Sequence, residues 1–301
     1  MVASPVTAAA AIDIGTNSLR LLVVDGDHQR RRTRIAGLGR GLDVTGHLAP
    51  KGRQRALEIL SEYRAEMDAA GVDWFRAVMT AVGRRASDAR DFCQEAAAIL
   101  GEEPQIISGV EEARLSYAGA IGDLDGGDWT VVDIGGGSTE IVGPAGAESF
   151  DVGSVVLTDA YLTERPASPD DLEAARSHAL EVIRTTPVGG QVVGVAGTWT
   201  SLAGMILGLE PYDPDQAHHT WVDRSQIDEW TGRLAAMDLE STARIPGLEP
   251  ARAPVILGGV IVAGATLDVL GVDRALVSEK DLLDGIVEEL LESGRPDGRV
   301  P

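Results

Sequence analysis

The sequence predicts an α/β protein made of two duplicated domains, and three observations lead to this prediction. The chain has 301 residues, which is too long for one ordinary core and suits two domains of roughly 150 residues each. A unit of strand, Gly/Ser turn and strand occurs twice, at equivalent positions 120 residues apart. Segments with strand and helix patterns alternate between and after the two units, which is typical of α/β proteins.

The repeated unit comprises residues 11–23, here called hairpin 1, and residues 131–142, called hairpin 2. The two segments read Ala11-Ile-Asp-Ile-Gly-Thr-Asn-Ser-Leu-Arg-Leu-Leu-Val23 and Val131-Val-Asp-Ile-Gly-Gly-Gly-Ser-Thr-Glu-Ile-Val142. Each is predicted to form a β-hairpin with an aspartate, Asp13 or Asp133, near the end of its first strand. A single repeat at this long interval indicates a duplicated domain rather than a short-period solenoid.

Apolar spacing and capping signals predict the other elements in order. In the first half we expect helices over residues 52–70, 88–100 and 111–120, with strands over 74–80 and 105–107. In the second half we expect helices over 168–184, 198–207, 225–237, 255–270 and 281–291, with strands over 191–196 and 275–278. The polar, glycine-rich segment 122–128 is the expected linker. The predicted domains are therefore residues 1–124 and 125–301.

Composition limits the class of protein. The single cysteine, Cys93, excludes a disulfide framework and a cysteine-based metal cluster, and it favours a cytoplasmic location. The N-terminus lacks the pattern of a secretion signal. The most apolar stretch, Pro254 to Leu270, is shorter than a membrane span, so we expect a buried helix there.

Charge is distributed unevenly along the chain. The formal net charge is −21, yet the first hundred residues carry a slight positive balance. A basic block accounts for this balance: Arg30, Arg31, Arg32, Arg34, Arg40, Lys51, Arg53 and Arg55. The block could hold a polyanion or form a solvated basic strand edge, and the sequence leaves both interpretations open. The low isoelectric point of about 4.5 and the 4% aromatic content argue against a nucleic-acid partner.

The two hairpins contain the residue types that phosphate chemistry requires. In hairpin 2, Gly135, Gly136, Gly137 and Ser138 can direct backbone N–H groups at one anion. Asp133 and Glu140 flank this turn as hard oxygen ligands of the kind that Mg²⁺ prefers. In hairpin 1, Thr16, Asn17 and Ser18 offer further donors. Arg20 stands where hairpin 2 has Glu140, and it could contact substrate or pack in the core.

Four motifs in order resemble the Ppx/GppA phosphatase family of the actin/Hsp70/sugar-kinase superfamily. They are the segments that begin at Asp13 and Asp133, Ser108-Gly-Val-Glu-Glu-Ala-Arg-Leu115, and Gly194-Val-Ala-Gly-Thr198. The resemblance covers residues 11 to 285, nearly the whole chain. It implies two actin-like (ribonuclease H-like) domains with the active site in the cleft between them, and it implies Mg²⁺ or Mn²⁺ as the cofactor.

The resemblance also implies roles for individual residues. Glu112 matches the catalytic base of the family, and Asp133 and Glu140 match its metal-binding and water-positioning acids, with Asp13 as a further metal ligand. Arg84 matches the arginine that grips substrate. The preceding Gly83 departs from the family pattern, so Arg85 is an alternative. Glu111 is expected to be a solvated acid at the start of a helix.

The implied reaction is hydrolysis of the terminal phosphoanhydride bond of inorganic polyphosphate. Short chains are expected as substrates, since the sequence stops before the C-terminal helical domains of longer members. Alternatives are hydrolysis of guanosine pentaphosphate, a kinase reaction with ATP, and a nucleotide sensor without turnover. Members of the family often form dimers, although nothing in this sequence fixes the oligomeric state. His218 and His219 show no metal-ligand spacing, and Gly37-Leu-Gly-Arg-Gly41 lacks the spacing of a dinucleotide-binding turn.

Overall fold

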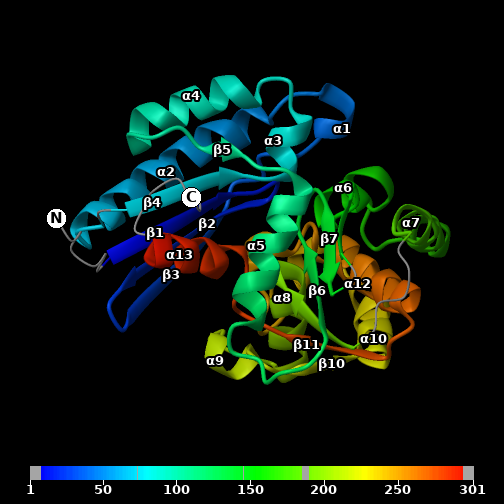
Figure 1. Ribbon diagram of the computed structural model, residues 1–301. Helices are drawn as coiled ribbons and strands as arrows, with labels where there is room; N and C mark the ends of the chain where they lie inside the picture. The colour runs from blue at the N-terminus through cyan, green and yellow to red at the C-terminus, as the bar shows by residue number, and fades with distance from the viewer. Residues whose placement is uncertain (1–7, 73, 145, 185–189, 294–301) are drawn as a thin grey trace. The chain divides into compact units, whose positions relative to one another are not determined.

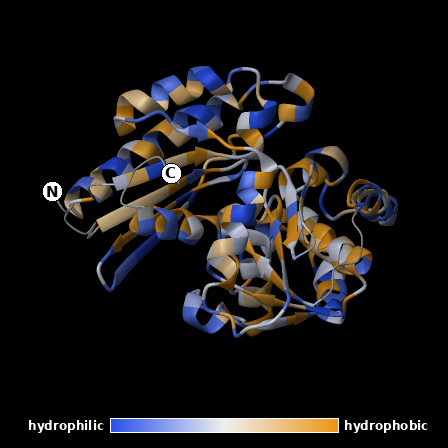
Figure 2. Cartoon of the chain, in the orientation of Figure 1, coloured by the Kyte–Doolittle hydropathy of each residue, from blue (hydrophilic) through white to orange (hydrophobic). Residues whose placement is uncertain are grey.

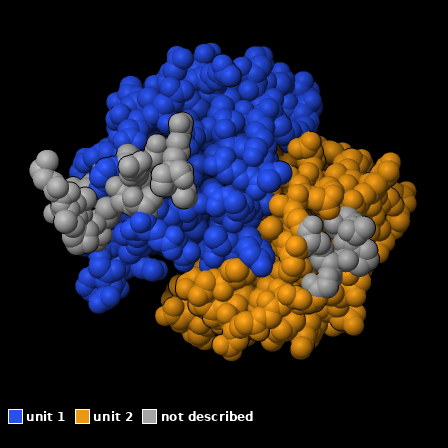
Figure 3. All heavy atoms as spheres, viewed as in Figure 1, with its two compact units in different colours: residues 1–119, 281–301 blue, residues 120–280 orange. Residues whose placement is uncertain are grey.

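The computed structural model describes residues 8–72, 74–144, 146–184 and 190–293. The chain forms two compact units, which Figure 3 shows in two colours. Unit 1 contains residues 1–119 and 281–301, and unit 2 contains residues 120–280. The chain therefore leaves unit 1 once and returns to it with its last helix.

Unit 1 contains a five-stranded sheet (Figure 1). Its strands are β1 (Ala8–Ile14), β2 (Ser18–Asp25), β3 (His28–Ile35), β4 (Trp74–Met79) and β5 (Gln105–Ile106). They lie in the order β3-β2-β1-β4-β5. β1 is antiparallel to β2 and parallel to β4, and all seven of its residues are buried. This burial fits a central strand that has helices on both faces.

Two pairs of helices cover the faces of this sheet. The helices of unit 1 are α1 (Leu42–Thr45), α2 (Pro50–Ala69), α3 (Ala81–Arg85), α4 (Ala89–Leu100), α5 (Gly109–Ile121) and α13 (Leu282–Ser293). Helices α2 and α4 pack on the face that presents Ile12 and Leu21. Helices α5 and α13 pack on the opposite face, which presents Ala11 and Leu22. Since side chains alternate along β1, Asp13 lies on the face that α5 and α13 cover.

Helices α5 and α13 approach each other closely in unit 1 because glycines stand at their contact. A Cβ atom on Gly119 would lie 2.0 Å from the carbonyl oxygen of Asp281, and one on Gly285 would lie 2.2 Å from that of Leu115. These separations are far below van der Waals contact. The missing side chains therefore set the distance between the two helices.

Unit 2 contains a six-stranded sheet in the order β10-β11-β9-β6-β7-β8. Its strands are β6 (Trp129–Ile134), β7 (Thr139–Gly143), β8 (Gly146–Phe150), β9 (Gln191–Val195), β10 (Trp221–Asp223) and β11 (Arg274–Val277). Its helices are α6 (Ser154–Tyr161), α7 (Pro169–Val182), α8 (Ala196–Leu207), α9 (Pro214–Ala217), α10 (Arg224–Ala235), α11 (Leu239–Thr242), the 3₁₀ turn η1 (Pro250–Arg252) and α12 (Ile256–Leu270). Trp199 and the apolar α12 lie in the core of this unit.

The two sheets share their topology, which confirms the predicted duplicated α/β fold class. In each unit the first strand is antiparallel to the second, the second is antiparallel to the third, and the first is parallel to the fourth. The fourth strand then pairs in parallel with a further strand, β5 in unit 1 and β11 in unit 2. The repeat in the sequence therefore marks a repeat of the whole sheet core.

The last helix differs from the expected domain division. The sequence assigned residues 125–301 to the second domain, whereas α13 packs on β1 and β2 of unit 1. Its leucines and isoleucine meet the small Ala9 and Ala11 there, and this apolar contact stabilises the helix on unit 1. The first boundary, at residues 119 and 120, lies close to the expected linker.

Three strands were absent from the predicted elements: β3, β8 and the three-residue β10. β3 and β8 are each the third strand of their unit, and most of their residues are exposed or half-buried. β3 is largely blue, and thus hydrophilic, in Figure 2. Neither β3 nor β8 has the apolar alternation that identifies a strand in sequence.

The apolar stretch near residue 260 forms α12, fifteen residues long, with thirteen of them buried in unit 2. Across the described residues, the structure contains no helix with the length and hydrophobicity needed to cross a bilayer.

The contact between α5 and α13 gives a stability prediction. We expect Gly285→Ala to lower the free energy of unfolding by about 1–3 kcal/mol, because its methyl group would overlap the backbone of α5. Urea unfolding monitored by circular dichroism measures the change. Gly232→Ala in α10 is the control, since a Cβ there meets nothing within 4 Å. It should stabilise by about 0.5–1 kcal/mol through helix propensity. Equal stability of Gly285→Ala and the wild type would contradict the close contact.

Candidate active site

The two hairpins have the same backbone geometry in their turns. In hairpin 1 the N–H of Gly15 donates to the carbonyl oxygen of Ser18 at 3.0 Å, and in hairpin 2 the N–H of Gly135 donates to that of Ser138 at 3.0 Å. The strand registers also match, because Asp13 lies opposite Arg20 and Asp133 lies opposite Glu140. The two hairpins therefore share one backbone conformation and differ in their side chains.

Backbone N–H groups at both turns are available to a ligand. Within the described parts of the chain, no group accepts a hydrogen bond from the N–H of Thr16 or Asn17, nor from that of Gly136 or Gly137. Asn17 is also buried, and its Oδ1 has no hydrogen-bond partner among the described residues. Successive open N–H groups in a turn are a common means of binding an oxyanion.

Helix α6 fixes the turn of hairpin 2 from behind. The N–H groups of Ser154 and Val155, in its first turn, donate to the carbonyl oxygens of Gly135 and Gly136 at 3.0 and 2.8 Å. A Cβ on Gly153 would stand only 2.7 Å from the same carbonyls, so a glycine is needed there. Helix α6 thus binds the carbonyl oxygens of the glycine turn. The N–H groups of Gly136 and Gly137 in that turn stay available to another partner.

Asp133 and Glu140 form a pair of opposed, buried acids in hairpin 2. They are directly opposite in register and only 4% and 0% exposed. The hydroxyls of Ser138 and Ser149 each donate to Oε1 of Glu140 at 2.7 Å, which fixes this carboxylate. Opposed like charges destabilise a strand pair. An oxygen-binding divalent cation would remove this cost, so the two acids fit a Mg²⁺ site.

Hairpin 1 balances the charge of its aspartate in a different way. Arg20 occupies the position of Glu140, and its Nε and Nη2 donate to Oδ2 of Asp13 at 2.9 and 2.7 Å. Burial raises the pKa of Asp13, although the charge of Arg20 opposes the shift. Oδ1 of Asp13 is buried and has no hydrogen-bond partner among the described residues. A metal role for Asp13 would therefore have to use Oδ1.

A buried ion cluster connects hairpin 1 to the start of α13. Arg20 also pairs with Asp281, and Arg31 of β3 pairs with Asp281 at 3.3 Å and Asp284 at 2.6 Å. Asp281 and Asp284 cap the helix as well. Oδ1 of Asp281 accepts the N–H of Leu283, and Oδ2 of Asp284 accepts the N–H of Asp281. This is the capping-box arrangement of a helix N-terminus, with both acids also neutralising arginines.

The cluster separates the pKa values of its carboxyl groups. Burial by itself would raise the pKa of Asp281, but the charges of Arg20 and Arg31 hold it below its ordinary value. Burial raises the pKa of Asp284, and the neighbouring charge of Asp281 adds to this. Of the carboxyl groups in this cluster, Asp281 is thus the one that stays ionised to the lowest pH.

Glu112 and Arg84 meet in unit 1. Glu112 lies in the first turn of α5, is 7% exposed, and its Oε2 accepts a hydrogen bond from Nη1 of Arg84 at 2.6 Å. Arg84 also donates to the carbonyl oxygen of Ile107 at 3.2 Å. The structure therefore brings together the two residues that the sequence proposed as base and substrate cation.

The alternatives to these two residues have other partners. Arg85 pairs with Asp43 in the first turn of α1. Glu111 was expected to be a solvated acid, but it pairs at 2.5 Å with Arg76, which is 6% exposed and also meets Glu289 of α13. Glu111 therefore belongs to a structural ion network, because a buried guanidinium requires a carboxylate.

His218 and His219 lie in a cluster with Asp123 and Lys280 in unit 2. Ligand atoms of the two histidines and Asp123 lie within 4.8 Å of one another. However, Nδ1 of His218 accepts the N–H of Glu279 at 3.1 Å, so in the neutral ring Nε2 carries the proton and donates to Asp123 at 3.0 Å. Lys280 also pairs with Asp123 at 3.0 Å. Hydrogen bonds and a cation thus occupy the groups that a metal would need.

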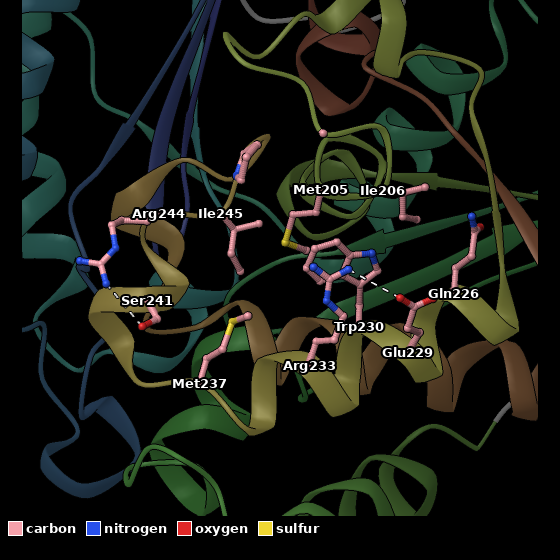
Figure 4. A pocket seen from close by; sticks show the side chains of 12 residues that line it. Met205, Ile206, Gln226, Glu229, Trp230, Arg233, Met237, Ser241, Arg244 and Ile245 are labelled. Carbon is pink, nitrogen blue, oxygen red and sulfur yellow. Dashed lines mark hydrogen bonds and ion pairs between the residues drawn. The ribbon is translucent and has the colours of Figure 1, made fainter.

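A cavity of about 520 Å³ lies in unit 2 along α8, α10 and α11 (Figure 4). Met205, Trp230 and Ile245 line it, and the guanidinium of Arg233 lies 3.9 Å from the centre of the Trp230 ring. None of the residues predicted to carry chemistry lines this cavity. The residues of the two hairpins and Glu112 remain the candidates for function.

Sequence reasoning missed three polar residues around the hairpins. Thr80 is buried, and a Cβ on Gly15 would point toward its Oγ1 and toward Oδ2 of Asp13. Ser149 supports Glu140 from β8, and Asp281 supports Arg20 from α13. Thr80 had a signal, since it ends the strand that lies beside β1. Ser149 and Asp281 had no such signal in the sequence. Ser149 lies on the polar edge strand β8 and Asp281 lies at the start of α13, and neither contact with the hairpins could be predicted.

Comparison with known proteins gives one consistent family. The model of the Ppx/GppA phosphatase family matches residues 22–293. A protein of Mycobacterium tuberculosis named "Exopolyphosphatase 2" is 36% identical, over 94% of this chain and 98% of its own length. A solved Ppx/GppA family member from Aquifex aeolicus is 30% identical with a TM-score of 0.76, over 97% of this chain and 100% of that one.

A further solved structure, described as an exopolyphosphatase-like protein, has a TM-score of 0.90 at 28% identity and covers 96% of this chain and 100% of its own. An exopolyphosphatase structure from Cytophaga hutchinsonii is 22% identical with a TM-score of 0.83, which supports the fold alone. Both units and their connection are thus represented in these related structures.

The ion cluster gives a prediction about stability and pH. We expect Asp281→Asn to lower the free energy of unfolding by about 3 kcal/mol at pH 7, because Arg20 and Arg31 lose a buried counter-charge. The pKa of Asp281 is below its ordinary 3.8 in the folded chain. Its stabilisation is therefore complete above that value and is lost as the pH falls through the folded pKa.

Denaturant unfolding at several pH values measures this effect, and the gap between variant and wild type should narrow below pH 3.8. Glu240→Gln is the control, since Glu240 is 82% exposed in its pair with Arg244 and should cost about 0–1 kcal/mol. A gap that stays constant down to the lowest accessible pH would contradict the assigned role.

Proposed function

Because the chain belongs to the Ppx/GppA phosphatase family, we propose that it is an exopolyphosphatase, which hydrolyses the terminal phosphoanhydride bond of inorganic polyphosphate. The observation that carries this proposal is the pair formed by the buried Glu112 and Arg84 at 2.6 Å. A carboxylate for water and a cation for phosphate are the two side chains that hydrolysis of a phosphoanhydride requires. The mycobacterial relative named as an exopolyphosphatase supports polyphosphate as the substrate.

The roles of the residues follow from their chemistry. Glu112 accepts the proton of the attacking water, as a positioned general base. Arg84 neutralises charge on the terminal phosphoryl group. The open N–H groups at Thr16 and Asn17 and at Gly136 and Gly137 bind phosphate oxygens. The water oxygen bonds to the terminal phosphorus while the bond from that phosphorus to the bridging oxygen breaks, so the shortened polyphosphate keeps the bridging oxygen and orthophosphate is released.

The substrate also changes the partner of Arg84. Without phosphate, the guanidinium lies on Oε2 of Glu112. A bound phosphoryl group competes for that guanidinium, since phosphate oxygens accept charge-assisted hydrogen bonds as a carboxylate does. Arg84 then turns from Glu112 to the phosphoryl group, and the carboxylate becomes available to water. Glu112 is thus activated only when substrate is present.

Asp133 and Glu140 are the residues that would hold a Mg²⁺ ion in this proposal. The opposed, buried carboxylates and the hydroxyls that fix Glu140 support the assignment. When bound, the ion neutralises phosphate charge and polarises the phosphoryl group. Asp13 is a weaker ligand, because Arg20 already binds its Oδ2. Mn²⁺, which shares a preference for oxygen ligands, is expected to substitute.

Guanosine pentaphosphate is the second substrate to test, since hydrolysis of its terminal phosphate breaks the same type of bond. A kinase reaction or a sensor without turnover is less well supported, because a buried carboxylate paired with a phosphate-binding arginine serves hydrolysis. The expected cytoplasmic location rests on the single cysteine, buried at Cys93, and stays a prediction.

Activity tests the proposal directly. Purified protein with Mg²⁺ should release orthophosphate from polyphosphate, and Glu112→Gln should lower kcat by about 100-fold or more through loss of the base. Malachite-green detection measures the product. Glu111→Gln is the matched control, because its carboxylate binds Arg76 and should leave kcat unchanged. Guanosine pentaphosphate and ATP are run in parallel. Nucleotide binding without phosphate release from any substrate would overturn the hydrolase proposal.

Metal binding has a thermal readout that needs no turnover. Mg²⁺ should raise the unfolding midpoint of the wild type and leave that of Glu140→Gln unchanged, because ligand binding to the folded state stabilises it. Asp13→Asn shows whether Asp13 contributes to the same site. An equal Mg²⁺ shift in all three proteins would place the metal elsewhere.

A further inference from the structure

The structure separates the basic block of residues 30–55 into neutralised and open cations. Arg31 pairs with Asp281 and Asp284, and Arg53 pairs with Asp88 at 3.1 Å and Glu95 at 2.9 Å. Arg32 and Arg34, on the other face of β3, pair with Glu66 at 3.2 Å and Glu62 at 3.7 Å. For these four arginines, a structural role accounts for the charge.

The other four cations have no carboxylate partner among the described residues: Arg30, Arg40, Lys51 and Arg55. Arg30 stands apart from the rest. It pairs with Val23, whereas Ile35 at the other end of β3 pairs with Ser18 beside the turn of hairpin 1. Five residues of extended strand separate Arg30 from Ile35, so the distance from Arg30 to that turn is roughly 16 Å.

The remaining three, called the basic triad, surround one loop. The side chain of Arg40 folds back on Gly37, where a Cβ would stand 3.1 Å from its Nε. Nη1 of Arg55 donates to the carbonyl oxygen of Ala36 at 3.4 Å. Lys51 and Arg55 are exposed and four residues apart on α2, and therefore share one face of that helix.

This loop is bonded directly to the turn of hairpin 1. The N–H groups of Ala36 and Gly37 donate to the carbonyl oxygen of Asn17 at 2.9 and 2.8 Å, and the N–H of Gly39 donates to that of Thr16 at 2.8 Å. A Cβ on Gly39 would overlap the methyl group of Thr16 at 2.5 Å. The glycines of this segment thus bring the basic triad beside the open N–H groups of Thr16 and Asn17.

We propose that Arg40, Lys51 and Arg55 bind the phosphates that follow the cleaved one in a polyphosphate chain. This inference rests on the proposed exopolyphosphatase function and adds a specificity site to it. A protein with a net charge of −21 repels a polyanion over most of its surface. Three cations without carboxylate partners beside a phosphate-binding turn supply the local attraction that the substrate needs.

The basic triad also discriminates between substrates. It contacts only phosphates beyond the reacting end, so affinity should rise with chain length until the chain spans the three side chains and should then stay constant. Guanosine pentaphosphate carries a nucleoside where polyphosphate continues, and it should gain less from the basic triad.

Steady-state kinetics of Arg40→Gln, Lys51→Gln, Arg55→Gln and the triple variant test the inference. We expect the triple variant to raise KM for long polyphosphate at least tenfold and to leave kcat and the KM for tripolyphosphate within about twofold. The slope of log KM against log salt concentration should become shallower by roughly two, since each contact with a flexible polyanion contributes about 0.7.

Arg30→Gln is the matched control, because it removes the same charge from an equally open site away from the turn. It should leave every constant near the wild-type value. The inference is overturned if Arg30→Gln raises KM as much as the single variants of the basic triad do. Nonspecific electrostatic attraction by any exposed cation would then explain the effect. It is also overturned if KM for tripolyphosphate rises as much as KM for long chains.

A binding measurement separates this inference from the proposed reaction. Fluorescence-labelled polyphosphate is titrated into Glu112→Gln with and without the three substitutions, so that no turnover is needed. Weaker binding in the quadruple variant supports the basic triad even if the wild type releases no phosphate. Equal binding in the two proteins overturns it even if the wild type is an active exopolyphosphatase.

Discussion

Two buried carboxylates at the start of α13 neutralise two half-buried arginines of the first sheet, and the rest of unit 1 depends on this interaction. Asp281 and Asp284 cap their own helix and bind Arg20 and Arg31. Arg20 in turn fixes the carboxylate of Asp13 at the edge of the phosphate turn. One cluster thus terminates a helix, places it on the sheet and orients an acid of the candidate site. Removing a single member would leave the others charged in a poorly solvated place.

Hairpin 1 and hairpin 2 show how one backbone frame can serve two purposes. Register and turn hydrogen bonds are the same, yet the residue opposite the aspartate is a cation in one and an acid in the other. Arg20 supplies internally the positive charge that hairpin 2 is proposed to take from a metal ion. The duplicated fold therefore does not imply two metal sites. Substitution at one cross-strand position is enough to make the two halves chemically different.

Much of the fold could be predicted from sequence because hairpins, helices and buried strands have periodic apolar patterns. The strands β3 and β8 could not, since edge strands with polar residues on both faces carry no such pattern. The docking of α13 was also missed, because sequence proximity to unit 2 says nothing about which sheet offers the small alanines it needs. At the site, motif residues were found readily. The partners of Arg20 and Glu140 were not predicted. Asp281 reaches Arg20 through the docking of α13, and Ser149 reaches Glu140 through the pairing of β8 with β7.

The return of the chain to unit 1 has a consequence for biosynthesis. Unit 2 is a continuous segment, so it can fold as soon as residue 280 has left the ribosome. Most of unit 1 precedes unit 2 in the chain, yet unit 1 waits for α13, which follows unit 2, before the apolar face around Ala11 is covered and Arg20 pairs with Asp281. Of the two units, the one that is begun first is therefore completed second. A nascent chain would expose that face throughout the synthesis of unit 2, and this is the interval in which chaperones would act on it.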